Sequence, residues 1–449
     1  MQSRESEWPF RMNNQQKPTV SVTNVDFPIV DSLLAIFQTL INAQTVVERA
    51  RQQTNDNTFP SGCETSTMAD DLKKGLEGVL VAESGLSSID GDEGRLIYRG
   101  YPIEDLARGA SYEEVVYLLW HGHLPNADEL EEFTVALNEE RDVSEDVLET
   151  MERLAAADEQ PMAALRTAVS MFSASEPEGN AEPEDLEATL RKGRRITAKI
   201  PTALAAFERY RLDEEPLDPH PDLGLAANFL YMLTGEEPSD THAETFDQAL
   251  ILHADHGLNA STFTSMVIGS TMADIYSAVT GGVSALSGPL HGGANQDVME
   301  VLFEIDESDL DHREWVEQAN EEGRRIPGFG HRVYNVKDPR AKILQERSEE
   351  LAEEGDDKWY NYTTTIEQYL SEEQGLAEKG IAPNVDFYSG SVYYQLGIPI
   401  DMYTPIFAMS RAGGWVGHVL EYQEDNRLIR PLSRYTGPED QEFVPLEDR

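Results

Sequence analysis

The stretch that decides the fold reads Pro327-Gly-Phe-Gly-His-Arg-Val-Tyr-Asn-Val-Lys-Asp-Pro-Arg340. Gly328 and Gly330 lack a Cβ atom and tolerate positive φ, so the backbone here can approach a ligand closely. His331 offers a hydrogen bond to a carbonyl group, and Arg340 offers a guanidinium fork that fits a carboxylate. A turn between two helices is the alternative for this stretch alone. Two companion stretches favour a site, Gly288-Pro-Leu-His-Gly-Gly-Ala-Asn295 and Asn384-Val-Asp-Phe-Tyr-Ser-Gly390.

Two residues of the companion stretches have surroundings suited to proton transfer. Gly288-Pro289 breaks a helix, so we expect His291 at the start of the next one, where the helix dipole disfavours an imidazolium. A neutral imidazole there can donate a hydrogen bond to a developing enolate oxygen. Asp386 stands between two apolar residues, so its carboxylate should be partly desolvated and more basic, as a general base requires. Each residue has an alternative interpretation. His291 could simply hydrogen-bond the backbone of the first helical turn, and Asp386 could be a solvated surface acid.

Cationic side chains are scarce in this chain and gather in two clusters. The first comprises Arg324, Arg325, Arg332, Lys337, Arg340 and Lys342, and the second Arg411, Arg427, Arg430 and Arg434. Forked arginines suit a small dicarboxylate, and the first cluster also suits the phosphates of a nucleotide-like ligand. Salt bridges to the many acids are the alternative use. We find no His/Cys spacing of the zinc type, no Walker loop and no dinucleotide fingerprint.

The net charge of −48, from 83 acidic and 35 basic residues, excludes nucleic acid and anionic membranes as default partners. The acids are spread through periodic apolar patterns rather than blocked in a tail. We interpret them as a surface that stays hydrated and screened at very high salt. An ordinary acidic cytosolic protein is the alternative.

A salt dependence of stability follows from this charge. Repulsion among like charges should unfold the protein or dissociate its oligomer when screening salt is removed. Thermal melts over a KCl series would measure this, and a melting temperature independent of KCl would contradict it.

The chain contains one cysteine, Cys63, which rules out an intrachain disulfide and favours a reducing, cytoplasmic compartment. The best apolar run, Phe27 to Val46, is interrupted by four polar residues, so no transmembrane segment is expected. Glu5 and Glu7 precede any apolar region, which is unlike a signal peptide.

The chain changes character near Met68. Residues 1–67 lack the strong acidic bias of the remainder, and we expect a poorly structured extension outside the fold, of the kind an early start codon would add. From residue 68 the periodicity is mainly helical, except for one or two hairpins between Val79 and Tyr101. Ser111 and Glu114 form a capping-box pattern, and Leu124-Pro125 is expected to end that helix. These features predict an all-α, multi-helical architecture.

Taken together, these motifs resemble citrate synthase, in order and spacing, from about Gly75 to Thr436. The matching segments are Gly75-Leu-Glu-Gly-Val79, Ser88-Ile-Asp-Gly91, Leu96-Ile-Tyr-Arg-Gly-Tyr101, His253-Ala-Asp-His-Gly-Leu-Asn259, Gly288–Asn295, Gly328–His331, Asp338-Pro-Arg340, Asn384–Gly390 and Arg430-Pro431. The acidity is similar to that of an extremely halophilic archaeal member.

The resemblance implies a homodimer that closes over oxaloacetate and acetyl-CoA, with no tightly bound cofactor and no metal. It implies a large domain over residues 68–288, a small domain over 289–400, and a segment over 401–449 that returns to the large domain. The small hairpin region precedes the helices. Domain closure would exclude water from the reaction.

The resemblance also implies roles for individual residues. Asp386 would take a methyl proton from acetyl-CoA, His291 would stabilise the enolate, and His331 would polarise the oxaloacetate carbonyl. Oxaloacetate carboxylates would be held by His256, Arg340 and Arg411, and by Arg430 from the other subunit. Coenzyme A contacts would come from Arg332, Lys337, Gly328 and Gly330. Asn335 departs from the family pattern, in which many members have a basic residue near the CoA phosphates.

Three alternatives to citrate synthase remain at this stage. A 2-methylcitrate synthase uses propionyl-CoA with the same catalytic residues, and one methylene changes binding by only about 1–3 kcal/mol. A non-catalytic acyl-CoA or dicarboxylate binding protein could share the fold, although it need not keep His291, His331 and Asp386. A purely structural acidic scaffold is the third.

Overall fold

The computed structural model describes residues 72–177 and 184–449. The chain divides into two units at Leu80 and Val81, and the described part of the first unit holds a single 3-10 turn, Lys74–Leu76 (η1). The extension expected over residues 1–67 lies outside the described residues. All further description concerns the unit from Val81 to Arg449.

A small antiparallel sheet opens this unit. Its strands are Ser87–Asp90 (β1), Arg95–Tyr98 (β2) and Tyr101–Pro102 (β3), in the order β1-β2-β3. Ser87 pairs with Tyr98 and Asp90 with Arg95, which leaves a tight turn that contains Gly91 and Gly94. The hairpin expected between Val79 and Tyr101 is therefore confirmed.

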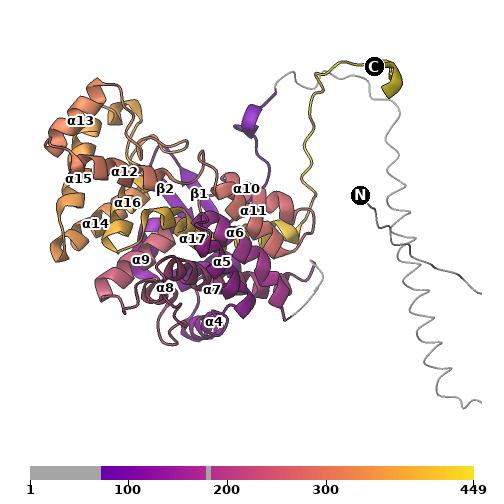
Figure 1. The fold of residues 1–449 in the computed structure, drawn as a ribbon, viewed down its shortest axis with the longest axis horizontal. Helices are drawn as coiled ribbons and strands as arrows, with labels where there is room; N and C mark the ends of the chain where they lie inside the picture. Colours follow the sequence, from indigo (N-terminus) through magenta and orange to yellow (C-terminus); the bar gives the residue numbers. More distant parts are fainter. Residues whose placement is uncertain (1–71, 178–183) are drawn as a thin grey trace, which may run out of the picture. The chain divides into compact units, whose positions relative to one another are not determined.

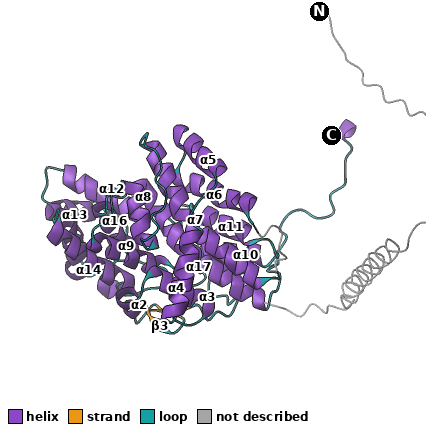
Figure 2. Ribbon diagram, turned by 90° about the horizontal axis from the view of Figure 1, so that it is seen from below, coloured by secondary structure: helices purple, strands orange, loops and turns teal. Residues whose placement is uncertain are grey.

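Helices make up most of the remaining described chain, which confirms the all-α prediction (Figure 2). The first ten are Ile103–Gly109 (α2), Tyr112–His121 (α3), Ala127–Glu139 (α4), Glu145–Ala156 (α5), Pro161–Phe172 (α6), Leu186–Arg211 (α7), Leu225–Thr234 (α8), Asp240–His253 (α9), Ala260–Gly269 (α10) and Ile275–Leu286 (α11). Six follow, Ala294–Glu307 (α12), His312–Glu321 (α13), Pro339–Glu354 (α14), Lys358–Glu367 (α15), Val385–Gln395 (α16) and Tyr403–Glu424 (α17).

Four short 3-10 helices and one π-helix, η3, complete the described elements. They are Ser173–Ser175 (η2), Gln368–Glu373 (η3), Ala377–Lys379 (η4), Ile400–Met402 (η5) and Leu446–Asp448 (η6). Among the described residues, no helix combines the length and apolar character needed to cross a membrane.

The ends of α3 illustrate one success and one error of local prediction. The capping box is present, since the Ser111 side chain accepts from the backbone N–H of Glu114 and the Glu114 carboxylate accepts from that of Ser111. The helix ends at His121, however, because Gly122 adopts a left-handed conformation with φ of 80° and caps it. The expected stop at Leu124-Pro125 was wrong by three residues.

Helix α17 runs through the middle of the fold and packs against α3, α6, α7, α9, α10 and α11 (Figure 1). Its glycines permit this close packing. A Cβ atom on Gly414 would lie 2.3 Å from the carbonyl oxygen of Ala254, and one on Gly417 would lie 2.8 Å from the Leu86 side chain. The helix therefore brings Arg411 and His418 into the interior, next to the segment that follows α9.

Helices α12 to α16 pack mainly on one another, with α16 between α12 and α14. Helix α14 also contacts α2 and α9, and α12 also contacts α17. The domain boundaries expected at residues 288 and 400 stay a prediction.

Candidate active site

The His331 loop is fastened directly to the start of α16, which carries Asp386. The Asn384 backbone N–H donates to the Gly328 carbonyl at 2.9 Å, and its side-chain amide donates to the Gly330 carbonyl at 3.0 Å. The Asn384 side-chain oxygen also caps α16 by accepting from the Asp386 N–H at 3.0 Å. One asparagine thus places the histidine loop beside the helix that holds the carboxylate.

The hydrogen bonds of His331 define which ring nitrogen can donate. Its Nδ1 accepts from the backbone N–H groups of Val333 at 3.0 Å and Tyr334 at 3.3 Å. Burial, together with the Arg340 charge, lowers the pKa of His331 to about 4, so the ring is neutral near pH 7. A neutral ring whose Nδ1 accepts must carry its hydrogen on Nε2, which is then available as a donor.

His291 occupies the N-terminus of a different helix from the one expected. Its own stretch leads into α12, which begins at Ala294 after a Gly293 cap. Its Nε2 instead accepts from the backbone N–H of Ser261 at 3.1 Å, in the first turn of α10. Burial and the Arg411 charge lower the pKa of His291 to about 4, so the neutral ring carries its hydrogen on Nδ1. His291 therefore has the neutral ring expected from the sequence, and its contact is with the first turn of α10.

Asp386 is the second residue of α16 and is partly buried. Within the described residues, its carboxylate accepts no hydrogen bond. Burial raises its pKa to about 6, although the Arg340 and Arg411 charges act in the opposite direction. A carboxylate that is both unpaired and more basic than usual is suited to accept a proton from carbon.

Two buried arginines lie beside these groups. Arg340 is 2% exposed, and its Nε and Nη2 donate to the Asp338 carboxylate at 3.0 and 2.7 Å. Burial alone would lower the pKa of Arg340, but the Asp338 charge raises it overall. Arg411 is 1% exposed, donates from Nε to the His253 carbonyl at 2.6 Å, and has no partner for Nη2 among the described residues. Burial lowers the pKa of Arg411 to about 10, so it stays cationic at neutral pH.

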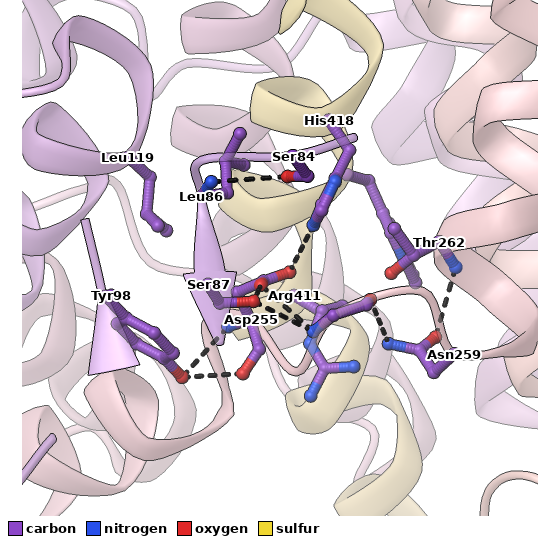
Figure 3. Close-up of polar contacts among 12 residues, drawn as sticks. Ser84, Leu86, Ser87, Tyr98, Leu119, Asp255, Asn259, Thr262, Arg411 and His418 are labelled. Atoms are coloured by element: carbon purple, nitrogen blue, oxygen red, sulfur yellow. Dashed lines mark hydrogen bonds and ion pairs between the residues drawn. The ribbon is translucent and has the colours of Figure 1, made fainter. Parts of the chain in front are cut away.

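The charge of Asp255 offsets part of the charge of Arg411. Figure 3 shows Asp255 bonded to His418 and Ser87, while the terminal nitrogens of Arg411 point away from the other residues drawn. The His418 Nε2 lies 3.0 Å from the Asp255 carboxylate. Burial opposes ionisation of Asp255, but His418, Arg411 and Ser87 bring its pKa to about 2. The free end of Arg411 remains available for another carboxylate.

His256 completes the cluster in the segment between α9 and α10. Its ring centroid lies 5.3 Å from that of His331, and its Nε2 lies 3.2 Å from the Tyr334 hydroxyl. Burial, followed by the charges of Arg340, His331 and Arg411, holds the pKa of His256 well below its usual range. The structure therefore gathers His256, His291, His331, Arg340, Arg411 and Asp386 around one region.

The residues at and near the expected coenzyme A contacts differ in their surroundings, since some are exposed and others are bound to neighbouring side chains. Arg332 is exposed, and its charge contributes to the lowered pKa of His291. Lys337 instead binds Glu367 at 2.7 Å and Gln345 at 2.5 Å, beside a cavity of about 300 Å³. The Asn335 amide donates to Asp92 in the hairpin turn at 2.7 Å. These contacts stay a prediction.

The two glycines of the histidine loop are explained first by packing. Both have positive φ, 79° at Gly328 and 85° at Gly330. A Cβ on Gly328 would lie 2.8 Å from the Phe387 side chain, whereas one on Gly330 would meet only Ile381 at 3.8 Å. The missing side chain of Gly328 therefore allows the loop to pack closely against α16. More space surrounds the Cα atom of Gly330.

Arg430 lies apart from the cluster, exposed in a C-terminal segment without regular structure. Sequence reasoning missed Asp338, Asp255, Ser261 and Tyr334 as partners of the site residues. Only Asp338 carried a local signal, as the N-cap residue before Pro339 at the start of α14.

An unpaired basic carboxylate, neutral imidazole donors and buried guanidinium groups fit an enzyme that removes a proton from carbon beside a bound acid. The family model for the citrate synthase C-terminal domain matches residues 75–432. The citrate synthase of Haloferax volcanii is 60% identical over 384 residues, which cover 85% of this chain and 100% of that protein. The chain belongs to the citrate synthase family and is an enzyme of the acyltransferase class.

Two further relatives bear on substrates. A 2-methylcitrate synthase of Mycobacterium tuberculosis is 42% identical, over 82% of this chain and 91% of that protein. A solved ternary complex of carboxymethyl coenzyme A and oxaloacetate with citrate synthase from Thermoplasma acidophilum has a TM-score of 0.78 and 32% identity. It covers 85% of this chain and 100% of that chain.

Proposed function

We propose that this chain condenses acetyl-CoA with oxaloacetate and hydrolyses citryl-CoA to citrate and CoA, the first step of the tricarboxylic acid cycle. The observation that carries the proposal is the pairing of a base, Asp386, with two imidazoles whose backbone hydrogen bonds leave one donor nitrogen each. The higher identity to a citrate synthase than to a 2-methylcitrate synthase supports acetyl-CoA as the acyl donor.

In this mechanism Asp386 takes a proton from the acetyl-CoA methyl group, and electron density moves to the thioester oxygen. The Nδ1–H of His291 donates a hydrogen bond to that oxygen and stabilises the enolate. A neutral donor suits this task, because a charged imidazole with its lowered pKa would transfer its proton early.

The enolate carbon then attacks the oxaloacetate carbonyl, forming the new carbon–carbon bond. The Nε2–H of His331 polarises that carbonyl and donates its proton to the developing alkoxide, which becomes the hydroxyl of citryl-CoA. The proton that Asp386 removed from the methyl group balances this transfer when both residues return to their starting states. Arg340, Arg411 and His256 hold the carboxylates in place. Water finally cleaves the thioester to give citrate and the free thiol of CoA.

We also propose a cytoplasmic homodimer in which Arg430 of each chain reaches the other chain's substrate. Support comes from the C-terminal segment, which carries strongly exposed apolar side chains that a partner would cover. These are Leu428, Leu432, Tyr435, Phe443 and Leu446.

Thiol release tests the proposed reaction. Purified protein in molar KCl would receive oxaloacetate with acetyl-CoA or, separately, propionyl-CoA, and a thiol reagent would report free CoA. Faster release with acetyl-CoA is expected, and omission of oxaloacetate should abolish it. Faster release with propionyl-CoA would replace the proposal with 2-methylcitrate synthesis, and silence from folded protein would favour a binding protein.

The pH profile offers a second check on the base. Because Asp386 must be ionised to accept a proton, kcat/KM should rise with pH and level off above its pKa of about 6. His291 and His331, with pKa values of about 4, are already neutral over this range. An acidic limb centred below pH 5 in the kcat/KM profile would contradict this assignment.

A further inference from the structure

Tyr334 contacts two histidines of the site, His256 and His331. Its backbone N–H donates to Nδ1 of His331 at 3.3 Å, and its hydroxyl lies 3.2 Å from Nε2 of His256. Its ring centroid is 4.9 Å from that of His331 and 5.6 Å from that of His256. Only 1% of Tyr334 is exposed, so water does not readily replace either contact.

The direction of the hydroxyl bond follows from the other partners available. Among the described residues, the Tyr334 hydroxyl has no second hydrogen-bond partner. If Nε2 of His256 were the donor, the buried hydroxyl hydrogen would have no acceptor, which is unfavourable. If the hydroxyl donates instead, both groups are satisfied, and the neutral imidazole carries its hydrogen on Nδ1.

The Nδ1 atom of His256 is the free end of this arrangement. It makes no hydrogen bond within the described part of the chain, and the ring neighbours His331. The charges of Arg340 and Arg411 act on His256 together with burial and keep the ring neutral, so it has one hydrogen to place. Which nitrogen holds that hydrogen decides whether His256 attracts or repels a substrate oxygen.

We propose that Tyr334 is a positioning residue for substrate binding: its hydroxyl donates to Nε2 of His256 and so presents Nδ1–H to a substrate carboxylate. The substrate part of this inference rests on the proposed function. The assignment of the hydrogen does not, because it concerns the free protein. Tyr334 thereby acts on both histidines: its hydroxyl sets the donor atom of His256, and its backbone N–H, together with that of Val333, sets the donor atom of His331.

Nitrogen NMR of protein labelled with ¹⁵N-histidine tests the assignment without any substrate. The signals of His256 would be identified by their loss in a His256→Gln variant, at pH 7.5 in molar KCl. We expect an unprotonated Nε2 and a protonated Nδ1 in the wild-type protein. A hydrogen found on Nε2 would overturn the proposal, and this measurement needs no Tyr334 variant to fold.

Tyr334→Phe separates positioning from general packing. The variant keeps the ring and the backbone N–H, so the His331 signals should not move, whereas the His256 hydrogen should shift toward Nε2. The KM for oxaloacetate should rise by about tenfold, as expected for one lost buried hydrogen bond, with the KM for acetyl-CoA changed less than threefold. A higher KM with an unchanged His256 tautomer would mean a merely structural role and overturn the proposal.

Tyr403→Phe is the matched control. Tyr403 is also fully buried, and its hydroxyl has no partner among the described residues. Its loss should leave both the His256 signals and the oxaloacetate KM unchanged. If wild-type protein shows the expected tautomer but releases no thiol, the proposed reaction fails while the Tyr334–His256 assignment stands.

Discussion

Replacing Asp386 by asparagine is expected to lower kcat by about a thousandfold, within the 10²- to 10⁴-fold range of general-base catalysis. Asparagine keeps the size of the side chain but cannot accept a proton from the methyl group. The KM for oxaloacetate should change only a few-fold, because Arg340, Arg411 and His256 remain. Steady-state thiol release in molar KCl measures both constants.

Asp386→Asn should also be more stable than the wild type. A gain in stability would distinguish a catalytic carboxylate from a structural one, whose replacement would lower stability. Burial raises the pKa of Asp386 to about 6, above that of an unfolded aspartate, so its ionised form destabilises the fold. This cost is absent below about pH 4, grows between pH 4 and 6, and is complete above pH 6. Thermal melts at pH 7.5 should show a gain for Asp386→Asn, of about 3 kcal/mol at most.

Asp297→Asn provides the control for charge near the base. Asp297 lies on α12 and its charge contributes to the raised pKa of Asp386, but it is exposed. Its kcat should stay within about threefold of the wild type, as surface charges in high salt are screened.

If Asp386→Asn retains kcat within tenfold of the wild type, Asp386 is not the base.

The residues that carry local signals were predictable, and their partners were not. Two motifs can be recognised in the sequence because each sets a backbone conformation that a short segment encodes. They are Gly328-x-Gly-His331 and Asp338-Pro-Arg340. The apolar neighbours of Asp386 indicated a desolvated, more basic carboxylate, and its raised pKa agrees with that expectation, while its role as the base stays a prediction. The all-α class followed from periodicity in the same way.

The contacts that tune these groups join segments far apart in the chain. His291 meets the first turn of α10 through Ser261, thirty positions earlier, rather than the helix that follows it. His418 pairs with Asp255 at a separation of 163 residues. No local pattern specifies such pairs, because they depend on how α10, α17 and the segment after α9 pack. Sequence reasoning therefore identified the neutral histidine but assigned it to the wrong helix.

Arg411→Lys is expected to raise the KM for oxaloacetate by about a hundredfold. Lysine keeps the positive charge beside Asp255 but loses the planar fork, so two charge-assisted hydrogen bonds to a carboxylate cannot form together. Such bonds contribute about 1.5–3 kcal/mol each, and a loss near 2.7 kcal/mol corresponds to a hundredfold weaker interaction. The KM for acetyl-CoA should change much less.

Two further measurements distinguish lost recognition from lost structure. Saturating oxaloacetate should raise the melting temperature of the wild type, and the same concentration should have little effect on Arg411→Lys. Arg166→Lys, on the exposed face of α6, should behave as the wild type in both assays. An unchanged oxaloacetate KM in Arg411→Lys would exclude the fork as a carboxylate ligand. The unpaired Nη2 of this buried guanidinium, 1% exposed overall, would then need another partner, because an orphaned charged donor in the interior is costly.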